Sequence, residues 1–530
     1  MSDQDGTARD AIETGRTALG IELGSTRIKA CLIDTSTSQV LAVGSHQWEN
    51  QYIDALWTYA LDDVWTGLQA AYAELARNVQ RDHGIGLTAV GSIGVSAMMH
   101  GYLPFGADGT LLTPFRTWRN TTTGAAAREL TDLLGVNIPL RWSIAHLHQA
   151  VLNNEPHVAQ LDWFTTLAGY VHWRLTGNRV LGVGDASGMF PIDAATGDYD
   201  ARMLAAYSAL TEGRLDLRAM LPRVLAAGDD AGSLTAEGAT LLDPTGKLQP
   251  GIPLCPPEGD AGTGMVATNA VAPRTGNVSA GTSVFAMVVL EHALAEVHEE
   301  IDLVTTPAGH PVAMVHCNNG ASELGAWAGV FGRFAQALGA DASQDRVFEV
   351  LLTEALAGQG DAGGILAYNT LSGEPVVGVE EGRPLVVRTP GSELTLANLM
   401  RAHVYGVFAA LSVGMEVLAN EGVAVERLFA HGGVFRTAGV AQRFLAAALK
   451  APVAVGDTAS EGGAWGMAVL AAFRAASGGG SLTDYLDRHV FASAEVTVAQ
   501  PLEADVEGYA RYLEAYRTGL AVERVAGAVL

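Results

Sequence analysis

The sequence predicts an α/β protein made of two similarly built domains, and three observations support this fold class. The chain has 530 residues, which is more than one hydrophobic core usually supports. Segments with the two-residue period of strands alternate along it with segments of helical period. A strand–turn–strand opening with a small-residue turn occurs once in each half, at 19–34 and at 275–290. We expect a ligand in the cleft between the two domains.

The first half opens with two short strands on either side of the turn Gly24-Ser25-Thr26, and a third strand follows. Apolar residues then recur at helical spacing from Val64 to Val79, and the apolar run after them is typical of a buried strand. The predicted order is β-β-β-α-β, over 19–22, 28–34, 39–45, 62–80 and 90–95.

The second half begins in a comparable way, with two strands around Gly281-Thr282-Ser283. A long amphipathic helix then leads into a short strand, the pair Gly432-Gly433 and another helix. These elements are predicted over 275–280, 284–290, 394–420, 427–430 and 438–449. The domain boundary is placed at 271–274, which contains Pro273.

The two ends of the chain differ in character. Residues 1–17 are polar, partly acidic and without an apolar stretch, so a disordered leader is expected there. Residues 481–530 carry Tyr509, Tyr512 and Tyr516 at helical spacing. We expect a helical extension packed on the second domain, and a docking surface for another subunit is the alternative.

The composition excludes several classes of protein. The chain is 48% hydrophobic and 17% charged, as expected of an ordered globular protein. Its formal charge of -25 argues against a broad nucleic-acid surface, so any bound phosphate must be held locally. Cys31, Cys255 and Cys317 form no CxxC pair and are expected to be buried free thiols. No apolar run reaches the ~18 residues of a membrane span, so a cytoplasmic enzyme without a membrane or nucleic-acid partner is predicted.

The two small-residue turns are candidate phosphate sites. A turn between strands can present N–H groups and small hydroxyls to an anion, and Arg27 or Lys29 can add positive charge to the first turn. The chain contains no GxxxxGK[ST] loop, so this is not the P-loop type of site. Ordinary hairpins remain the alternative, although the equivalent places of the two turns favour opposite ends of one triphosphate.

Motifs spread along the chain resemble those of the FGGY carbohydrate kinase family, and are nearest to its xylulose kinase branch. The matching segments are Met99-His100-Gly101, Asp185-Ala186-Ser187-Gly188, Gly259-Asp260-Ala261-Gly262, Gly373-Glu374-Pro375, Gly432-Gly433 and Glu461-Gly462-Gly463-Ala464. The resemblance implies the actin-like ATPase fold, with two duplicated RNase H-like domains around a central cleft. It implies a sugar-binding domain at 18–271 and a nucleotide-binding domain at 272–480.

Asp260 is the predicted catalytic base. The attacking sugar hydroxyl must lose a proton as the new P–O bond forms, and a carboxylate at the mouth of the cleft can accept it. The family has an aspartate with this role in a Gly-Asp-Ala setting. The alternative is that Asp260 caps the helix that begins near Ala261, and both roles can coexist.

The resemblance assigns sugar contacts to Met99, His100, Gly101, Trp118, Arg119, Asn120, Asp185 and Asp260. In the xylulose kinase branch the corresponding imidazole binds a sugar hydroxyl, whereas a structural histidine is the alternative. Trp118-Arg119-Asn120 departs from the Trp-Asn-Asp or Trp-Gln-Asp that the family has there, which leaves the sugar open. Asp185 either touches the substrate or is only a turn residue.

ATP contacts are predicted at the two turns and at the glycine pair that the resemblance marks, namely at Gly24, Ser25, Thr26, Lys29, Gly281, Thr282, Ser283, Gly432 and Gly433. Gly432-Gly433 would leave room for adenine and ribose, and a plain helix-entry turn is the alternative. Glu22 stands where relatives have Asp near Mg²⁺, and its longer arm can act through water. Alternatively, Glu22 is paired with Arg27 and has only a structural role.

The predicted function is transfer of the γ-phosphate of ATP to a hydroxyl of a ketopentose such as xylulose, with ATP and Mg²⁺ as cofactors. Kinases of the same family that act on ribulose, glycerol, erythritol, gluconate or a signalling sugar are alternatives. A non-kinase actin-like ATPase switch and an inactive sugar-binding regulator are further alternatives. The resemblance makes a homodimer one option for the oligomeric state.

Overall fold

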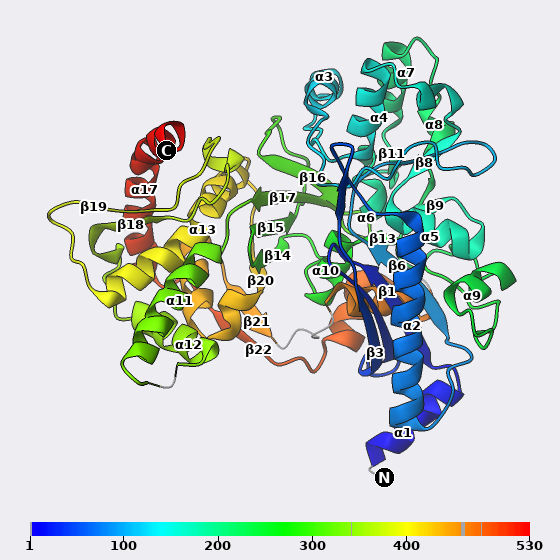
Figure 1. The fold of residues 1–530 in the computed structure, drawn as a ribbon, viewed down its shortest axis with the longest axis horizontal. Coiled ribbons are helices and arrows are strands. Elements are labelled where there is room, and N and C mark those ends of the chain that lie inside the picture. The colour runs from blue at the N-terminus through cyan, green and yellow to red at the C-terminus, as the bar shows by residue number, and fades with distance from the viewer. Residues whose placement is uncertain (1–2, 341, 457–461, 477, 479) are drawn as a thin grey trace. The chain divides into compact units, whose positions relative to one another are not determined.

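The computed structural model describes residues 3–340, 342–456, 462–476, 478 and 480–530, which form two compact units (Figure 1). Unit 1 comprises Met1–Val271, Leu303–Val312 and Thr458–Ala494. Unit 2 comprises Ala272–Asp302, Ala313–Asp457 and Glu495–Leu530. The chain passes between the units within β16 (Ile301–Thr305) and again within β17 (Pro311–Cys317).

Unit 1 has a five-stranded sheet in the order β13-β6-β1-β2-β3. Strand β1 is antiparallel to β2 and parallel to β6, and β13 is parallel to β6. The predicted strands of this half are confirmed. Their bounds are β1 (Thr17–Leu23), β2 (Arg27–Asp34), β3 (Val40–Gln47), β6 (Ser92–Ala97) and β13 (Glu258–Gly259).

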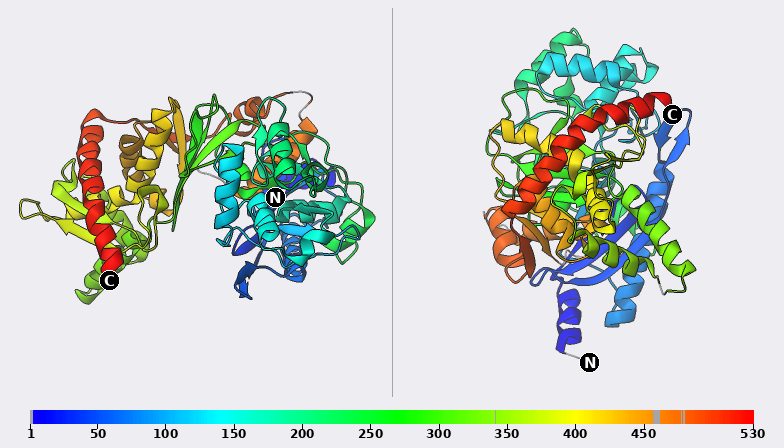
Figure 2. Two further views of the ribbon diagram at one scale, coloured as in Figure 1. Left: turned by 90° about the horizontal axis from the view of Figure 1, so that it is seen from above. Right: turned by 90° about the vertical axis from the view of Figure 1, so that its left-hand side faces the viewer.

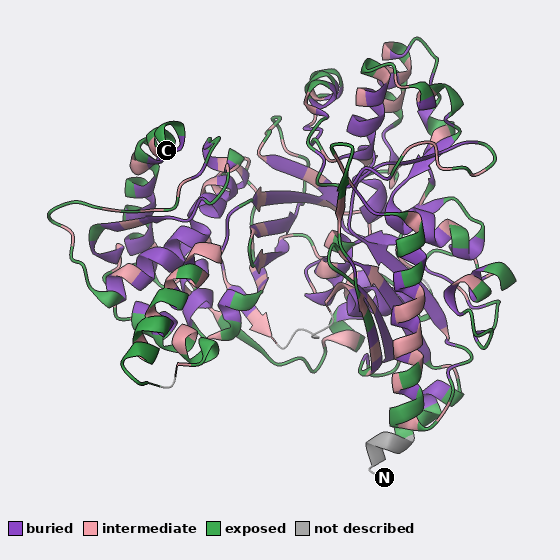
Figure 3. Ribbon diagram, in the orientation of Figure 1, coloured by how far each residue is buried: buried purple, intermediate pink, exposed green. Residues whose placement is uncertain are grey.

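Helices cover this sheet because each buries an apolar face on it. The predicted first helix is α2 (Leu61–His83), which packs on β2 and β3. Its buried residues recur at helical spacing between Val64 and Val79, and its outer face is exposed (Figure 3). Helix α15 (Gly463–Ala476) packs on β1 and β6, and α10 (Asp260–Ala267) packs against α15.

The other elements of unit 1 are short strands and helices of the intervening segments. They are β4 (Gln51–Ile53), β5 (Leu56–Thr58), β7 (Leu103–Phe105), α3 (Gly124–Leu134), α4 (Ser143–Leu152), β8 (Trp163–Thr165), α5 (Leu167–Thr176), β9 (Val180–Gly182), α6 (Val183–Ala186), β10 (Ile192–Asp193), β11 (Asp198–Tyr199), α7 (Ala201–Leu210), α8 (Leu217–Met220), β12 (Arg223–Leu225), α9 (Ala236–Leu242) and α16 (Leu482–Tyr485).

Two expectations about the chain ends need correction. The described part of the expected disordered leader contains helix α1 (Asp3–Glu13), because Ala11 and Ile12 are buried and Arg16 pairs with Asp10. The second domain was expected to run without interruption over 272–480, but α15 belongs to unit 1. This helix is apolar on nearly all sides and needs the sheet and α10 to bury them.

Unit 2 repeats the core of unit 1. In its sheet β17, β15, β14, β20, β21 and β22 are consecutive neighbours. Strand β14 is antiparallel to β15 and parallel to β20, which is the relation of β1 to β2 and β6. The bounds are β14 (Thr275–Ala280), β15 (Val284–Val289), β20 (Arg427–His431), β21 (Val453–Gly456) and β22 (Val496–Ala499). The duplicated RNase H-like arrangement is therefore present in both units.

The helices of unit 2 pack on one another and on this sheet. They are α11 (Ser322–Ala337), α12 (Gln344–Ala355), α13 (Leu396–Asn420), α14 (Val440–Leu449) and α17 (Glu503–Val529). Between α12 and α13 the chain forms the antiparallel pair β18 (Ile365–Tyr368) and β19 (Leu385–Arg388). By length and hydropathy, α13 is the one helix of the described residues that could cross a membrane. Its most apolar window is 78% buried, as in a core helix of a globular unit.

The C-terminal helix α17 packs on α14 and β18, and Figure 2 shows it crossing one face of unit 2. The predicted residues Tyr509, Tyr512 and Tyr516 are buried, and the hydroxyl of Tyr509 lies 2.8 Å from that of Ser412. Asp505 pairs with Arg443 at 2.5 Å. Helix α17 lies in unit 2, whereas residues 482–494 belong to unit 1. The three cysteines are free and buried, as predicted.

Candidate active site

Three predicted segments meet at one edge of the unit 1 sheet. Strands β1, β6 and β13 are parallel, so their carboxyl ends lie together. The register pairs Leu23 with Ala97, and Ala97 with Gly259. The chain continues from these ends into the turn 24–26, into residues 98–101 and into Asp260, which places the candidate base beside a candidate phosphate turn.

Asp260 is the first residue of α10, and its carboxylate is fixed from one side. Its Oδ1 accepts hydrogen bonds from the N–H groups of Met99 and Ala261, both at 3.0 Å. The residue itself is exposed to solvent. Partial desolvation raises the pKa of Asp260 above its ordinary value, against the lowering effect of the two N–H groups. An oriented and accessible carboxylate of this kind can accept a proton, and the same residue also starts the helix.

His100 follows the end of β6 in a conformation uncommon for a non-glycine residue, with φ of 71°. The imidazole is buried, and its Nδ1 lies 3.4 Å from the carbonyl oxygen of Gly188. Burial lowers the pKa of His100 well below its ordinary value, so the ring is neutral. The next residue, Gly101, accepts a 2.5 Å hydrogen bond from the hydroxyl of Ser143 on α4. The approach of His100 to Gly188 brings the motif 99–101 into contact with the motif 185–188.

A pair of buried carboxyl groups lies behind Asp260, and the sequence identified only one of them. The Oδ2 of Asp185 accepts a 2.6 Å hydrogen bond from Thr166, whereas its buried Oδ1 has no partner among the described residues. Glu258, the residue that was not predicted, accepts from the N–H groups of Gly184 and Asp185 at 3.4 and 3.0 Å. Burial, with repulsion from Asp260, raises the pKa of Asp185 to about 7. Burial, with repulsion from Asp185, raises the pKa of Glu258 to about 8.

This pair predicts a pH dependence of stability. Between pH 4 and about pH 8 the folded pair holds more protons than the unfolded chain, so its contribution to stability falls as pH rises. Asp185→Asn removes the repelling charge, and we expect its free energy of unfolding to decline less from pH 5.5 to 9 than that of the wild type. The expected difference is at least the ~1.4 kcal/mol of one pKa unit. Urea unfolding at the two pH values measures it.

Asp132→Asn is the matched control for this measurement, because Asp132 is exposed on α3. Its decline should equal that of the wild type. Equal declines in wild type and Asp185→Asn would refute the interpretation of a proton-holding pair.

The segment 118–120 lies against the hairpin of β4 and β5. The amide of Asn120 accepts from the N–H of Trp57 at 2.9 Å and donates to its carbonyl oxygen at 2.8 Å. Asn120 is buried, and its two bonds hold β5. A direct sugar contact by its amide would have to replace one of these bonds. Trp118 is 39% exposed, and the guanidinium of Arg119 lies 4.2 Å from the ring centroid of Trp57.

The turn 24–26 is anchored by its carbonyl groups. The carbonyl of Gly24 accepts from the indole N–H of Trp48 at 2.7 Å, and that of Ser25 accepts from the hydroxyl of Tyr59 at 2.6 Å. The rings of Trp48 and Tyr59 stack at 4.2 Å. The side chains of Ser25 and Thr26 are exposed, which suits a site for an anion.

Glu22 is half-buried near the end of β1, opposite Lys29 of β2. A Cβ placed on Gly463 would come 2.2 Å from a carboxylate oxygen of Glu22 and 3.1 Å from the hydroxyl oxygen of Thr263. Both oxygens therefore lie beside Gly463. The described residues contain no group of three His, Cys, Asp or Glu that could hold a metal ion. One carboxylate fits Mg²⁺ that takes its other ligands from phosphate and water. Glu461 of the predicted motif lies outside the described residues.

In unit 2 the turn 281–283 is held on the beginning of α11. The N–H of Gly320 donates to the carbonyl of Thr282 at 2.7 Å, and the N–H of Ala321 donates to that of Gly281 at 2.8 Å. Glu374, which belongs to a predicted motif, is fully buried and accepts from the backbone and side chain of Asn319 at 3.1 and 3.0 Å. Glu374 therefore stabilises the segment around Asn319, and the next two residues of this segment bond to the turn 281–283.

A cavity of about 810 Å³ in unit 2 adjoins this turn, a size that suits a nucleotide. Two predicted residues, Gly281 and Gly433, line it, whereas Thr282, Ser283 and Gly432 do not. The residues that the sequence did not identify come from α11, α12 and the segment after β20. They include Leu324, Gln344, Arg346, Phe348, Glu349, Leu352, Val434 and Arg436.

Gly432 and Gly433 differ in the physical property that favours glycine at each position. Gly432 has φ of 115°, and a Cβ there would come 2.2 Å from the carbonyl oxygen of Ala280. A Cβ on Gly433 would meet no atom within 4 Å. Gly432 thus permits the turn itself, and Gly433 leaves space in the cavity.

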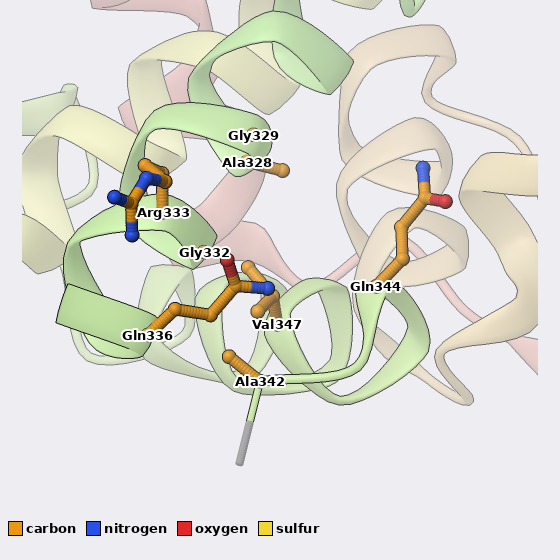
Figure 4. A pocket seen from close by; sticks show the side chains of 8 residues that line it. All are labelled: Ala328, Gly329, Gly332, Arg333, Gln336, Ala342, Gln344 and Val347. Atoms are coloured by element: carbon orange, nitrogen blue, oxygen red, sulfur yellow. The ribbon is translucent and has the colours of Figure 1, made fainter. Parts of the chain in front are cut away.

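A smaller cavity of about 270 Å³ lies where α11 and α12 cross (Figure 4). Arg333 and Gln336 of α11 and Gln344 of α12 line it, and Gln344 also lines the larger cavity. None of the predicted site residues lines the smaller cavity.

Comparisons with known proteins identify the family of the chain. The N-terminal domain model of the FGGY family of carbohydrate kinases matches residues 17–266, and the C-terminal domain model matches residues 276–475. A xylulose kinase from Lactococcus lactis subsp. lactis (strain IL1403) is 23% identical over 234 residues, which are 41% of this chain and 43% of that relative.

Two solved structures show the same fold. A kinase from Brucella ovis, described as a xylulose kinase, has a TM-score of 0.76 at 20% identity and covers 97% of this chain and 100% of its own. A gluconate kinase from Lactobacillus acidophilus has a TM-score of 0.74 at 16% identity and covers 97% of this chain and 98% of its own. The expected actin-like fold and family are confirmed. The chain belongs to the FGGY family of carbohydrate kinases.

Proposed function

We propose that the protein is an ATP-dependent kinase that phosphorylates a hydroxyl of a ketopentose such as xylulose. The observation that carries this proposal is Asp260, an exposed carboxylate oriented by two N–H groups at the sheet edge that also holds the turn 24–26. The family and the xylulose kinases among the relatives support the acceptor. The gluconate kinase of similar fold keeps a sugar acid as the second candidate.

In the proposed reaction, the sugar binds in unit 1 beside residues 99–101. The sugar hydroxyl loses its proton to Asp260 while its oxygen forms a bond to the γ-phosphorus, and ADP leaves with the electrons of the broken P–O bond. Residues 281–283 would hold phosphates, and the cavity at Gly433 would hold the base and ribose. Mg²⁺ bound with ATP would neutralise phosphate charge, with Glu22 as its water-mediated protein ligand.

ADP release with Mg-ATP tests this function on a panel of xylulose, ribulose, erythritol, glycerol and gluconate. We expect one acceptor to raise ADP release at least about tenfold above the rate without sugar, because water is a poor competitor in a site built for a sugar hydroxyl. An ATPase rate that no acceptor changes would favour the nucleotide-switch alternative. Mg²⁺ dependence, a homodimer and a cytoplasmic location stay predictions.

A further inference from the structure

Arg119 is a cation held at the candidate sugar site without an anionic partner. Its guanidinium lies 4.2 Å from the ring centroid of Trp57 and 5.9 Å from that of Trp118. The side chain is exposed, and no carboxylate of the described residues pairs with it. We propose that Arg119 binds an oxyanion at the acceptor site, either the phosphoryl group in transfer or the carboxylate of a sugar acid.

The position of Arg119 places its charge at the functional edge of the unit 1 sheet. The hydroxyl of Tyr59 donates to the carbonyl of Ser25, in the turn that follows β1. Arg119 is close enough to Tyr59 to lower its pKa electrostatically, against the larger opposite effect of burial. Arg119 therefore acts electrostatically on the residue that anchors the turn 24–26. The carboxyl end of β13 brings Asp260 to the same edge as this turn.

Hydrogen bonds and a ring contact hold the platform under Arg119. The amide of Asn120 accepts a hydrogen bond from the N–H of Trp57 and donates one to its carbonyl oxygen, and the ring centroids of Tyr52 and Trp57 lie 4.9 Å apart. Stacking on this ring leaves the N–H groups of the guanidinium in its plane, where they can form two parallel bonds to a carboxylate or phosphate. An anion that binds here meets a side chain that is already ordered, so less conformational entropy is lost.

Arg116, in the same segment, has a structural role and differs from Arg119 in its burial and its partner. Arg116 is buried and forms an ion pair with Glu155. Arg119, three residues later, points outward and keeps its donors available in a chain with a formal charge of -25. A surface cation over a ring adds little stability, so the ring contact alone is a weak reason for an arginine without a carboxylate partner here.

This inference rests on the proposed kinase activity and deepens it, and Arg119→Gln and Arg119→Lys test it. We expect Arg119→Gln to lower kcat/KM at least about tenfold. Arg119→Lys should recover only part of the loss, because an ammonium cannot form the two parallel bonds. If the oxyanion is the phosphoryl group, kcat falls for every acceptor. If it is a carboxylate, KM rises for gluconate and not for xylulose.

Arg77→Gln, an exposed change on α2, is the control and should equal the wild type. Arg119→Gln within twofold of the wild type on both acceptors would overturn the proposal. If no acceptor is phosphorylated, the kinase proposal has failed, and calorimetric binding of gluconate and of inorganic phosphate then tests Arg119 separately. Binding that is lost in Arg119→Gln supports the anion site, and absent or unchanged binding overturns it.

Discussion

Asp260→Asn is expected to lower turnover by about 10²–10⁴-fold while the affinities for ATP and sugar change less than about threefold. Both backbone donors, the N–H groups of Met99 and Ala261, bond to one oxygen of Asp260. An amide can keep that oxygen as the acceptor and place its NH₂ group on the solvent side. The start of α10 is then preserved, but the side chain can no longer take a proton.

Single-turnover kinetics and calorimetric binding separate these effects, with thermal unfolding as a check on the fold. Asp132→Asn serves again as the exposed control. Turnover within threefold of the wild type would refute the assignment of the base. A large fall in the unfolding temperature instead would show that holding the start of α10 is the main role of Asp260.

Gly432→Ala is expected to abolish detectable nucleotide binding and to destabilise unit 2. The native φ of 115° costs an alanine about 1–3 kcal/mol, and its Cβ would also collide with the carbonyl oxygen of Ala280 at 2.2 Å. That carbonyl belongs to β14 just before the turn 281–283, so the collision would displace the candidate phosphate site.

The adjacent glycine provides the matched control. Gly433→Ala adds a methyl group to open space and should leave thermal stability unchanged, whereas Gly433→Val projects into the cavity and should weaken ATP binding at unchanged stability. Thermal unfolding and ATP calorimetry measure both quantities. Equal stability of Gly432→Ala and Gly433→Ala would contradict this account of the turn.

Local patterns predicted the local elements of the fold. The hairpins of both halves, helix α2 and helix α13 occur where the sequence predicts them, because strand and helix periods are set by which neighbours face the core. The return of α15 to unit 1 was not predicted, because an apolar helix does not reveal which of two sheets covers it. The helix in the leader depends on Ala11 and Ile12, too few apolar residues for a periodic signal.

The site was predictable only where a motif marks it. Asp260 and the two turns stand in motifs, and parallel strand ends bring two of these segments together in unit 1. Glu258 carries no motif of its own, and only the approach of α6 shows that its carboxylate caps Gly184 and Asp185. The lining from α12 was missed because Phe348 and Leu352 follow the pattern of an ordinary amphipathic helix.

The fate of a labelled γ-phosphate tests the central claim most directly. Wild type and Asp260→Asn would be incubated with [γ-³²P]ATP, Mg²⁺ and each acceptor, and the label in sugar phosphate would be counted against the label in inorganic phosphate. The account predicts label in one sugar phosphate with the wild type and almost none with Asp260→Asn. Label that appears only in inorganic phosphate, at a rate independent of sugar and of Asp260, would contradict it.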